Sequence, residues 1–400
     1  MSKRAIGVLI ACFSTIFIAY AIRYSYGVLL PEMLPALAIS KAEAGVIFSS
    51  YFVAYTVLSP VLGSVSDRYD VRVILALFVA MMGAGTLLMA FSSSLLQASL
   101  FFTLAGIGCS ACWAPVMAVA QRWTSDKRRG MALAFIDAGS SLGIVAGGAA
   151  VPLIVTAFSD WRMGWASLGG LGLFVAVLNF LLVRSYPAEQ SSSPQTRQRR
   201  GRFAGIAYKQ LLRDKRFWLI GLAYLLTGFS IIIPFTFLST YAVQELAFSY
   251  ESATRLITVI GVAAIVGKMV MGPISDRIRN GRIKIMMLCA ILIAMGALGM
   301  AYSRGWVLVV ITAIFGAGYG GVWSMYAACA SDYFSKESAG GIIGLWTFYL
   351  GIGSTCAPIL AGWTADITGT LVWSFIIAAA GAVVSFILLI PMLRSPVKNK

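Results

Sequence analysis

The amino-acid sequence predicts an all-α membrane protein with twelve transmembrane helices in two six-helix bundles. Its composition is the first reason: of 400 residues, 59% are hydrophobic and 12% are charged, against roughly 45–50% and roughly 25% in soluble domains. The second reason is a series of long apolar spans, and the third is a repeat that relates the two halves of the chain. The composition argues against a soluble enzyme, a disordered chain and a fibrous repeat.

Each predicted span is long enough for a membrane helix, which needs roughly 20 residues. In chain order the spans cover 5–36, 44–66, 71–92, 97–121, 130–158, 164–183, 217–243, 254–275, 283–302, 306–330, 338–363 and 371–393. The basic start before the first span resembles a signal peptide, but the apolar run is too long and lacks a small-residue cleavage site. We therefore interpret it as a retained first helix.

The net charge is +16, and the distribution of its basic residues predicts how the protein is oriented in the membrane. With both termini placed in the cytoplasm, 25 of the 31 Lys and Arg residues lie on the cytoplasmic side and two lie within spans. The four outside are Lys41, Arg162, Arg255 and Arg304. This bias follows the positive-inside rule. It predicts a multi-pass protein of the inner (plasma) membrane with cytoplasmic termini, and it gives no support to a nucleic-acid partner.

The hydrophilic stretch 184–216 divides the chain. It holds nine basic and two acidic residues together with Ser and Pro, a composition that cannot form a hydrophobic core. We interpret it as a cytoplasmic linker between an N-terminal bundle, 1–183, and a C-terminal bundle, 217–400, of six spans each.

Landmarks of the first half recur in the second half about 210 residues later. The matched sets are Gly63, Asp67, Arg68 with Gly272, Asp276, Arg277, and Gly106, Gly108, Trp113 with Gly316, Gly318, Trp323. Because each half has an even number of spans and starts inside, the repeat is a parallel one, about an axis along the membrane normal.

The duplicated G-x-x-x-D-R loop on a twelve-span chain resembles the major facilitator superfamily, and the resemblance covers essentially the whole chain. It implies a cytoplasmic gate in which Asp67 latches against neighbouring helix ends, with Arg122 as its basic partner. The gate residues so implied are Gly63, Asp67, Arg68, Arg72, Arg122, Gly272, Asp276, Arg277 and Arg282. The first loop departs from the family at Asp70, where Gly is usual, while the second keeps Gly281. The alternative is a solvated loop that only sets topology.

Three ionisable residues lie within spans: Arg23, Asp137 and Lys268. Each costs on the order of 2.5–3.5 kcal/mol by insertion scales, so each is a functional candidate. Arg23 shares a helix face with Tyr20 and Tyr26, and a guanidinium can hold a carboxylate through two parallel hydrogen bonds. We therefore predict that Arg23, Tyr20 and Tyr26 bind substrate.

The Arg23 segment is similar to the first helix of anion:cation symporters, where an Asp-Arg pair handles carboxylates, but Ile22 stands in place of the Asp. That departure weakens the expectation of proton coupling at this position. The alternative interpretation is an arginine that snorkels to the outer interface.

Lys268 and Asp137 each lie eight residues from a cytoplasmic helix end, about 12 Å along a helix. The Lys268 segment resembles helix eight of monocarboxylate and oxalate transporters, in which a basic residue contributes to anion binding. Helices five and eight adjoin in that fold, so Asp137 and Lys268 could form an ion pair. Three interpretations stay open: a latch between the halves, a purely structural pair, or Lys268 as a second substrate cation with Asp137 as proton carrier.

Aromatic residues on the fourth, tenth and eleventh spans are weaker candidates for a wall around the substrate. They are Trp113, Tyr319, Trp323, Tyr326, Trp346 and Tyr349. Ordinary packing explains such stripes equally well. We also interpret the C-x-x-C of Cys109 and Cys112 as small packing residues on a membrane helix, in a chain without His.

Together these features predict a secondary transporter rather than an enzyme, without cofactor or metal. It is expected to move a small organic anion by alternating access of the two halves, and the embedded net charge of +1 favours a monocarboxylate. Proton coupling and anion exchange are both compatible. The expected partners are the anion, protons and the lipid bilayer, and the protein is expected to be monomeric.

The alternative function is efflux of drugs or other small metabolites by a transporter of the same superfamily. Two embedded cations do not suit cationic drugs. A substrate-sensing receptor on this fold would need an added signalling domain, for which the short tails leave no room.

Overall fold

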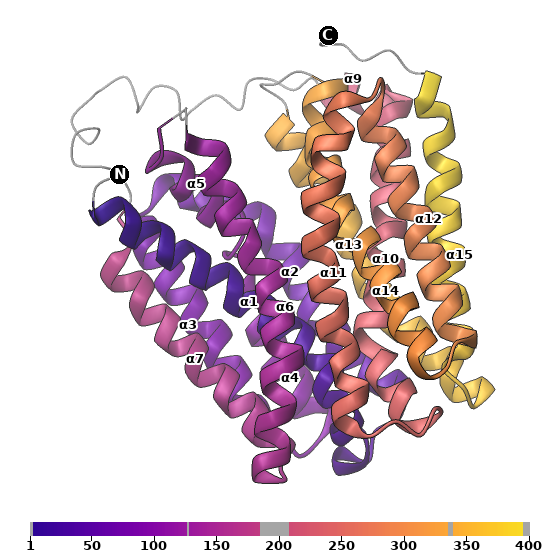
Figure 1. The fold of residues 1–400 in the computed structure, drawn as a ribbon. Coiled ribbons are helices and arrows are strands. Elements are labelled where there is room, and N and C mark those ends of the chain that lie inside the picture. Colours follow the sequence, from indigo (N-terminus) through magenta and orange to yellow (C-terminus); the bar gives the residue numbers. More distant parts are fainter. Residues whose placement is uncertain (1–2, 126–127, 185–207, 335–338, 395–400) are drawn as a thin grey trace. The chain divides into compact units, whose positions relative to one another are not determined.

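The computed structural model describes residues 3–125, 128–184, 208–334 and 339–394, and every element in these ranges is a helix. The first half contains α1 (Lys3–Leu37), α2 (Lys41–Arg68), α3 (Val71–Met89), α4 (Leu95–Cys109), α5 (Ala114–Arg122), α6 (Arg129–Phe158) and α7 (Trp161–Leu182). The second half contains α9 (Tyr208–Arg213), α10 (Lys215–Gln244), α11 (Tyr250–Arg277), α12 (Gly281–Tyr302), α13 (Gly305–Tyr333), α14 (Ala339–Thr368), α15 (Val372–Leu389) and the 3₁₀ helix η3 (Ile390–Arg394). Figure 1 shows these helices in chain order.

Twelve stretches among the described residues are long and apolar enough to cross a membrane. This confirms the predicted all-α membrane architecture and the number of spans. The α4 and α5 helices together make up one of the twelve, Leu95–Arg122.

The chain forms two compact units. We call them the N-terminal unit, Met1–Leu37 with Ser50–Arg202, and the C-terminal unit, Ala38–Ser49 with Phe203–Lys400. Most of the predicted linker lies outside the described residues, so the division at 184–216 stays a prediction.

The first turns of α2 pack within the C-terminal unit. The Asp366 carboxylate of α14 accepts hydrogen bonds from the backbone N–H groups of Lys41 (3.1 Å) and Ala42 (2.8 Å). It thereby satisfies donors that a helix start leaves unpaired, and its negative charge suits the positive end of the helix dipole. Further along α2, the Ser49 hydroxyl donates to the carbonyl oxygen of Thr355 at 2.6 Å.

Glycines let the helices of each unit approach backbone to backbone. A Cβ at Gly106 of α4 would overlap the carbonyl oxygen of Tyr51 of α2, and a Cβ at Gly316 of α13 would lie 2.7 Å from that of Ile260 of α11. The two glycines hold equivalent places in the repeat, so the same close contact is built twice. Small residues at such contacts are characteristic of helix packing in membranes.

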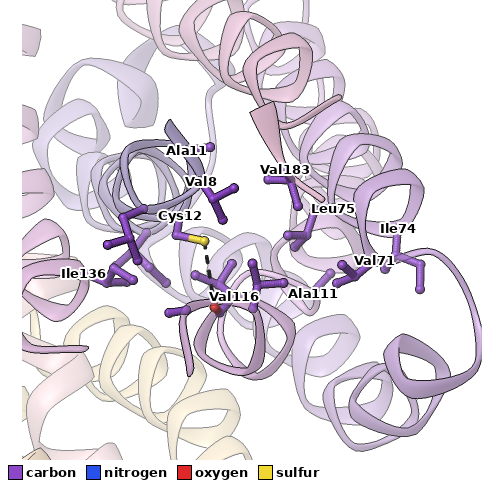
Figure 2. Packing of buried hydrophobic residues seen from close by; sticks show 14 of the residues in the cluster. Val8, Ala11, Cys12, Val71, Ile74, Leu75, Ala111, Val116, Ile136 and Val183 are labelled. Atoms are coloured by element: carbon purple, nitrogen blue, oxygen red, sulfur yellow. Dashed lines mark hydrogen bonds between the residues drawn. The ribbon is translucent and has the colours of Figure 1, made fainter. Parts of the chain in front are cut away.

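The α5 helix is fixed to α1 by a cluster of buried aliphatic side chains (Figure 2). Val116 of α5 packs in this cluster with Val8 and Ile16 of α1 and Ile136 of α6. The thiol of Cys12 also donates to the carbonyl oxygen of Val116, at 3.9 Å. This packing holds α5 in place although the helix has only 9 residues.

The fourth predicted span, 97–121, is not one continuous helix. The α4 helix ends at Cys109, residues 110–113 form turns, and α5 begins at Ala114. Pro115 suits the start of α5, because the first turn of a helix does not need its N–H. Proline alone does not break a helix in this structure, since Pro60 and Pro152 lie inside α2 and α6. The C-x-x-C motif therefore lies at a helix break rather than within a helix, which corrects the sequence-based interpretation.

Candidate functional site

Arg23 lies in the middle of α1 and is only 7% exposed. Its Nε donates a hydrogen bond to the Tyr51 hydroxyl of α2 at 3.3 Å. Its Nη2 donates to the Cys109 sulfur, at the last residue of α4, also at 3.3 Å. Three helices of the N-terminal unit thus meet at one buried guanidinium.

Aromatic rings surround the same guanidinium. Its central carbon lies 5.1 Å from the ring centroid of Tyr20, 5.4 Å from those of Tyr51 and Phe52, and 4.9 Å from that of Tyr55. Such cation–π contacts are worth about 0.5–2 kcal/mol each, more where water is excluded. The rings stabilise the cation without cancelling its charge.

No carboxylate contacts Arg23 within the part of the chain that the structure describes. Its hydrogen-bond partners are a phenol and a thiol rather than a carboxylate. A thiol is a weak acceptor compared with a carboxylate oxygen. The arrangement can therefore bind an anion more strongly than it binds its present partners.

The close contact between α2 and α4 positions these partners. Because Gly106 has no side chain, the backbone of α4 touches that of α2 at Tyr51. Tyr51 is fully buried, and Cys109 follows Gly106 by three residues, so both side chains reach Arg23.

Tyr26 and Trp113 were predicted to join Arg23 at the substrate site. Trp113 lies beside Tyr20, with ring centroids 6.4 Å apart, and is 38% exposed, so it forms the rim of the Arg23 cluster. Tyr26 is fully buried and stacks on Phe102, with centroids 5.2 Å apart. The structure records no contact between Arg23 and Tyr26 among the interactions that it describes.

Asp137 is half-buried in α6; the Ser140 hydroxyl donates to its backbone carbonyl oxygen at 2.7 Å and lies 3.5 Å from its Oδ1. Lys268 is half-buried in α11 of the C-terminal unit. Its neighbour Gly267 packs closely on the backbone of Ala317 of α13. The predicted Asp137–Lys268 ion pair joins the two units and stays a prediction.

The aromatic residues of α13 form a hydrogen-bonded, uncharged cluster in the C-terminal unit. Tyr326 stacks on Tyr224 with ring centroids 4.1 Å apart, and its hydroxyl pairs with that of Thr227 at 2.8 Å. Trp323 lies edge-on to Tyr224 and to Tyr319, both at 5.8 Å. Tyr319 and Tyr326 are both buried.

Trp346 and Tyr349 of α14 lie apart from this cluster, against the start of α10. Trp346 is fully buried, and its indole N–H donates to the carbonyl oxygen of Phe217 at 3.0 Å. Tyr349 packs edge-on against Phe217 and Trp218, at 6.1 and 5.9 Å. Packing accounts for these contacts.

The cytoplasmic loop residues differ between the two copies of the motif. In the second copy, the Arg282 guanidinium pairs with Asp276 at 2.5 Å and with Asp332 at 3.6 Å, and it also donates to the Ser275 hydroxyl. In the first copy, the equivalent Arg72 lies over the ring of Phe180, 4.0 Å from its centroid.

For some gate residues of the first copy only the backbone is described. Gly63, Asp67 and Arg68 belong to α2, but their contacts lie outside what the structure describes, so the latch between Asp67 and Arg122 stays a prediction. The second-copy residues Gly272 and Arg277 lie near the end of α11, and a Cβ at Gly272 would meet no other described atom within 4 Å.

Asp70 replaces the glycine that the family usually has, and the structure gives it a local role. Its carboxylate accepts from the backbone N–H of Arg72 at 3.0 Å and caps the start of α3. Gly281 begins α12 in the second copy, where a Cβ would overlap the Ser275 carbonyl. The helix after the motif therefore starts with a side-chain cap in the first copy and with a closely packed glycine in the second.

A groove of about 600 Å³ opens elsewhere, between the starts of α11 and α13. Arg255, Ser249, Leu256 and Trp306 are among its lining residues. None of the predicted substrate residues lines it. The chemistry of the embedded charges, rather than this groove, therefore marks the candidate site.

Sequence reasoning missed Tyr51, Phe52, Tyr55 and Cys109 as neighbours of Arg23. Tyr51 and Tyr55 are one helical turn apart in the second predicted span, and two phenols on one face of an apolar span are a usable signal. Cys109 stood out as part of the C-x-x-C motif, but nothing in the sequence pairs it with Arg23.

Comparison with known proteins agrees with this architecture. The family model of the Major Facilitator Superfamily matches residues 12–283 and 255–400. The hexuronate transporter of Bacillus subtilis (strain 168) is 26% identical over 413 residues, covering 98% of this chain and 96% of that protein. The membrane sensor protein UhpC of Escherichia coli (strain K12) is 24% identical, covering 95% of this chain and 91% of that protein.

A solved structure has the same fold. The crystal structure of a variant of the nucleoside transporter NupG superposes with a TM-score of 0.79 at 15% identity, covering 96% of this chain and 99% of that chain. Twelve spans, a parallel repeat and a family match from residue 12 to the end of the chain show that it belongs to the Major Facilitator Superfamily, as a multi-pass membrane transporter of small molecules.

Proposed function

We propose that this protein transports a small organic anion with one carboxylate group, and that Arg23 binds the carboxylate. One observation carries the proposal: a guanidinium buried in the middle of α1 contacts a phenol, a thiol and aromatic rings, and no carboxylate among the described residues. A cation in a membrane span is costly, so its presence without a carboxylate partner calls for a function. An anionic substrate supplies the missing charge.

The geometry suits a carboxylate in particular. A guanidinium offers two parallel N–H groups to the two oxygens of a carboxylate. A substrate carboxylate would take the place of the Cys109 thiol at Nη2, while the Tyr51 hydroxyl at Nε keeps the guanidinium oriented. The rings of Tyr20, Phe52 and Tyr55 then offer apolar and polarizable surface to the organic part of the anion.

The comparisons support an anionic substrate. The B. subtilis relative is named for hexuronate, and a hexuronate carries one carboxylate. In our proposal Lys268 is either a second contact for the anion or the partner of Asp137, and protonation of Asp137 couples transport to protons. Exchange of one anion for another is the competing mode.

We further propose the orientation that the charge bias favours. Both termini lie in the cytoplasm of a cell with this protein in its inner membrane, the two bundles alternate access to the site, and the loops with Asp67 and Asp276 form the cytoplasmic gate. The ion pairs of Arg282 with Asp276 and Asp332 support this assignment for the second loop.

Sensing of an external anion is a second candidate function, because one similar protein is named a membrane sensor. A sensor would bind the same ligand at Arg23 but would not move it across the membrane. Flux and binding measurements together separate the two functions.

Uptake into proteoliposomes tests the proposal. The panel contains lactate, glycolate and glucuronate, their uncharged amides and a cationic compound, each with and without an inward proton gradient. We expect uptake of at least one carboxylate, a loss of about 100-fold or more in Arg23→Gln, and a smaller loss in Lys268→Gln. The matched control is Arg255→Gln, because Arg255 is exposed, its ion pair with Glu251 is worth little, and we expect unchanged uptake.

Uptake of a neutral or cationic compound without any carboxylate would contradict the anion proposal. Carboxylate binding that Arg23→Gln abolishes, without uptake in the presence or absence of the proton gradient, would favour the sensor. Gradient-dependent uptake that Asp137→Asn abolishes would establish the proton-coupled mode over exchange.

A further inference from the structure

We infer that Cys109 is a modification site for small anionic sulfur electrophiles, a class that comprises thiosulfonates and disulfides bearing a sulfonate or carboxylate. The inference rests on the proposed anion site at Arg23 and extends it to a covalent reaction. The modified cysteine would place an anionic group beside Arg23 and so block the transport site.

The position of Cys109 is the first support. It is the last residue of α4, directly before the turns at 110–113, and its sulfur lies 3.3 Å from Arg23 Nη2. The thiolate is the form of cysteine that attacks sulfur electrophiles. A guanidinium at hydrogen-bond distance stabilises negative charge on that sulfur, because opposite charges attract strongly where water is excluded.

The surroundings of Arg23 are the second and independent support. The guanidinium is more than nine-tenths buried, and a phenol and the Cys109 sulfur itself are its hydrogen-bond partners among the described residues. It therefore attracts an anionic reagent to the sulfur. The same field repels a cationic reagent of equal size.

The other buried cysteines have different partners. The Cys112 thiol donates to the carbonyl oxygen of Gly108 at 3.7 Å, and the Cys12 thiol to that of Val116 at 3.9 Å. The thiols of Cys289 and Cys329 lie against methionine sulfurs, at 3.2 and 3.6 Å. Cys109 has a cationic partner instead, and this predicts that its reactivity depends on the charge of the reagent.

Cys109 is itself only 2% exposed, so a reagent has to follow the path that the proposed substrate takes to Arg23. Trp113, four residues after Cys109, is 38% exposed and lies beside the half-buried Tyr20. Tyr20 in turn lies against the Arg23 guanidinium. A ligand that reaches Arg23 past these two rings also reaches the sulfur.

The reaction with a methanethiosulfonate is a thiol–thiosulfonate exchange, which follows the same course as a thiol–disulfide exchange. The Cys109 proton passes to solvent, and the thiolate attacks the sulfenyl sulfur of the reagent. A new S–S bond forms, the bond between the sulfenyl and sulfonyl sulfurs breaks, and methanesulfinate leaves with the electron pair. The cysteine sulfur is oxidised to the disulfide level and the reagent is reduced to the sulfinate.

The test measures modification rates at each cysteine of the full chain in membranes, by mass spectrometry of its peptides. The two probes are 2-sulfonatoethyl methanethiosulfonate, which is anionic, and 2-(trimethylammonio)ethyl methanethiosulfonate, which is cationic. Each rate is divided by the rate of the same probe with free cysteine in solution. We expect Cys109 to prefer the anionic probe by about tenfold, and Arg23→Gln to remove this preference.

Arg23→Lys is the second variant, because it keeps the charge and should keep most of the preference. Cys356, which is exposed in the C-terminal unit, is the reference site and should show no dependence on Arg23. Equal normalised rates for both probes at Cys109, or a preference that Arg23→Gln leaves intact, would overturn the inference. So would an unmodified Cys109 when Cys356 has reacted completely.

These results are separable from those of the uptake experiment. Charge selectivity at Cys109 without transport of any carboxylate would refute the proposed function and keep the modification site. Carboxylate uptake through Arg23 without charge selectivity at Cys109 would refute this inference and keep the proposed function.

Discussion

The fourth helix of the first repeat and its counterpart in the second repeat share landmarks but differ in continuity. The first copy is divided into α4 and α5 by the turns at 110–113, whereas α13 runs unbroken from Gly305 to Tyr333. Pro115 stands in the first copy where Met325 stands in the second, 210 residues later. The proline therefore accompanies the break, in the first turn of α5, although prolines such as Pro60 and Pro152 lie inside unbroken helices.

The break coincides with a difference in chemistry. In the N-terminal unit, Cys109 at the break touches the buried cation Arg23. The position 210 residues after Cys109 is Tyr319, which packs edge-on against Phe235 with ring centroids 4.9 Å apart. The N-terminal unit thus presents a charged site and the C-terminal unit a neutral aromatic cluster, from the same underlying scaffold.

The equivalent glycines offer the change with the largest expected effect. Gly106→Ala should lower stability by about 1–3 kcal/mol, because its Cβ would overlap the Tyr51 carbonyl. It should also reduce carboxylate uptake, because the overlap displaces Tyr51 from Arg23. Gly316→Ala should lower stability by a similar amount, because its Cβ would lie too close to the Ile260 carbonyl oxygen. It should reduce carboxylate uptake less than Gly106→Ala does.

Thermal unfolding in detergent and uptake into proteoliposomes measure these two effects separately. Gly170→Ala is the control, because a Cβ there meets no other described atom within 4 Å. Gly106→Ala with full stability and full uptake would show that the close approach of α2 and α4 does not position the site.

Replacement of Pro115 by the residue of the second repeat should have an intermediate effect. In Pro115→Met the restored N–H can donate to the carbonyl of Ala111, so α4 can continue through the turns. We expect Cys109 to move from Arg23, the preference of Cys109 for the anionic probe to fall, and the KM for the carboxylate to change by about threefold to tenfold.

Met325→Leu is the matched control in the C-terminal unit and should leave both quantities unchanged. Unaltered probe preference in Pro115→Met would mean that the break does not set the position of Cys109.

Removing one tyrosine hydroxyl in each unit should have the smallest effects. The two variants compare the charged site of the N-terminal unit with the neutral aromatic cluster of the C-terminal unit. Tyr51→Phe removes the hydroxyl that accepts from Arg23 Nε, at a cost of about 1 kcal/mol. We expect the carboxylate to bind about fivefold more weakly to this variant. Tyr326→Phe removes the hydrogen bond to Thr227, so it should lower stability by a similar amount and leave the preference for a carboxylate over its amide intact.

Equilibrium binding and thermal unfolding of the two variants are the measurements. Should Tyr326→Phe weaken carboxylate preference more than Tyr51→Phe, the division into a charged and a neutral unit would be wrong.

Most of the architecture could be predicted from the sequence because the bilayer imposes strong constraints. Spans of about 20 apolar residues and the distribution of Lys and Arg are readable without tertiary information. The break before Pro115 could not be read from the proline alone, since Pro31, Pro60 and Pro152 lie inside unbroken helices. We predicted a continuous helix there, and the structure shows otherwise.

The candidate site could be predicted only in part. Arg23 was identifiable as a charge in an apolar span, but its partners were not, because they depend on how α1, α2 and α4 rotate against one another. Tyr26 illustrates the limit: it shares a helix face with Arg23, yet its ring stacks on Phe102. Cys109 was interpreted as packing, and its contact with Arg23 arises from the helix break and the close approach at Gly106.

The most direct test of the central claim is equilibrium binding of a transported carboxylate and of its uncharged amide to the purified protein and to Arg23→Gln. The account predicts that the wild type prefers the carboxylate by about tenfold or more and that Arg23→Gln binds both compounds equally weakly. Arg255→Gln should behave as the wild type. An undiminished preference for the carboxylate in Arg23→Gln would contradict the account, because the anion would then be recognised by another residue.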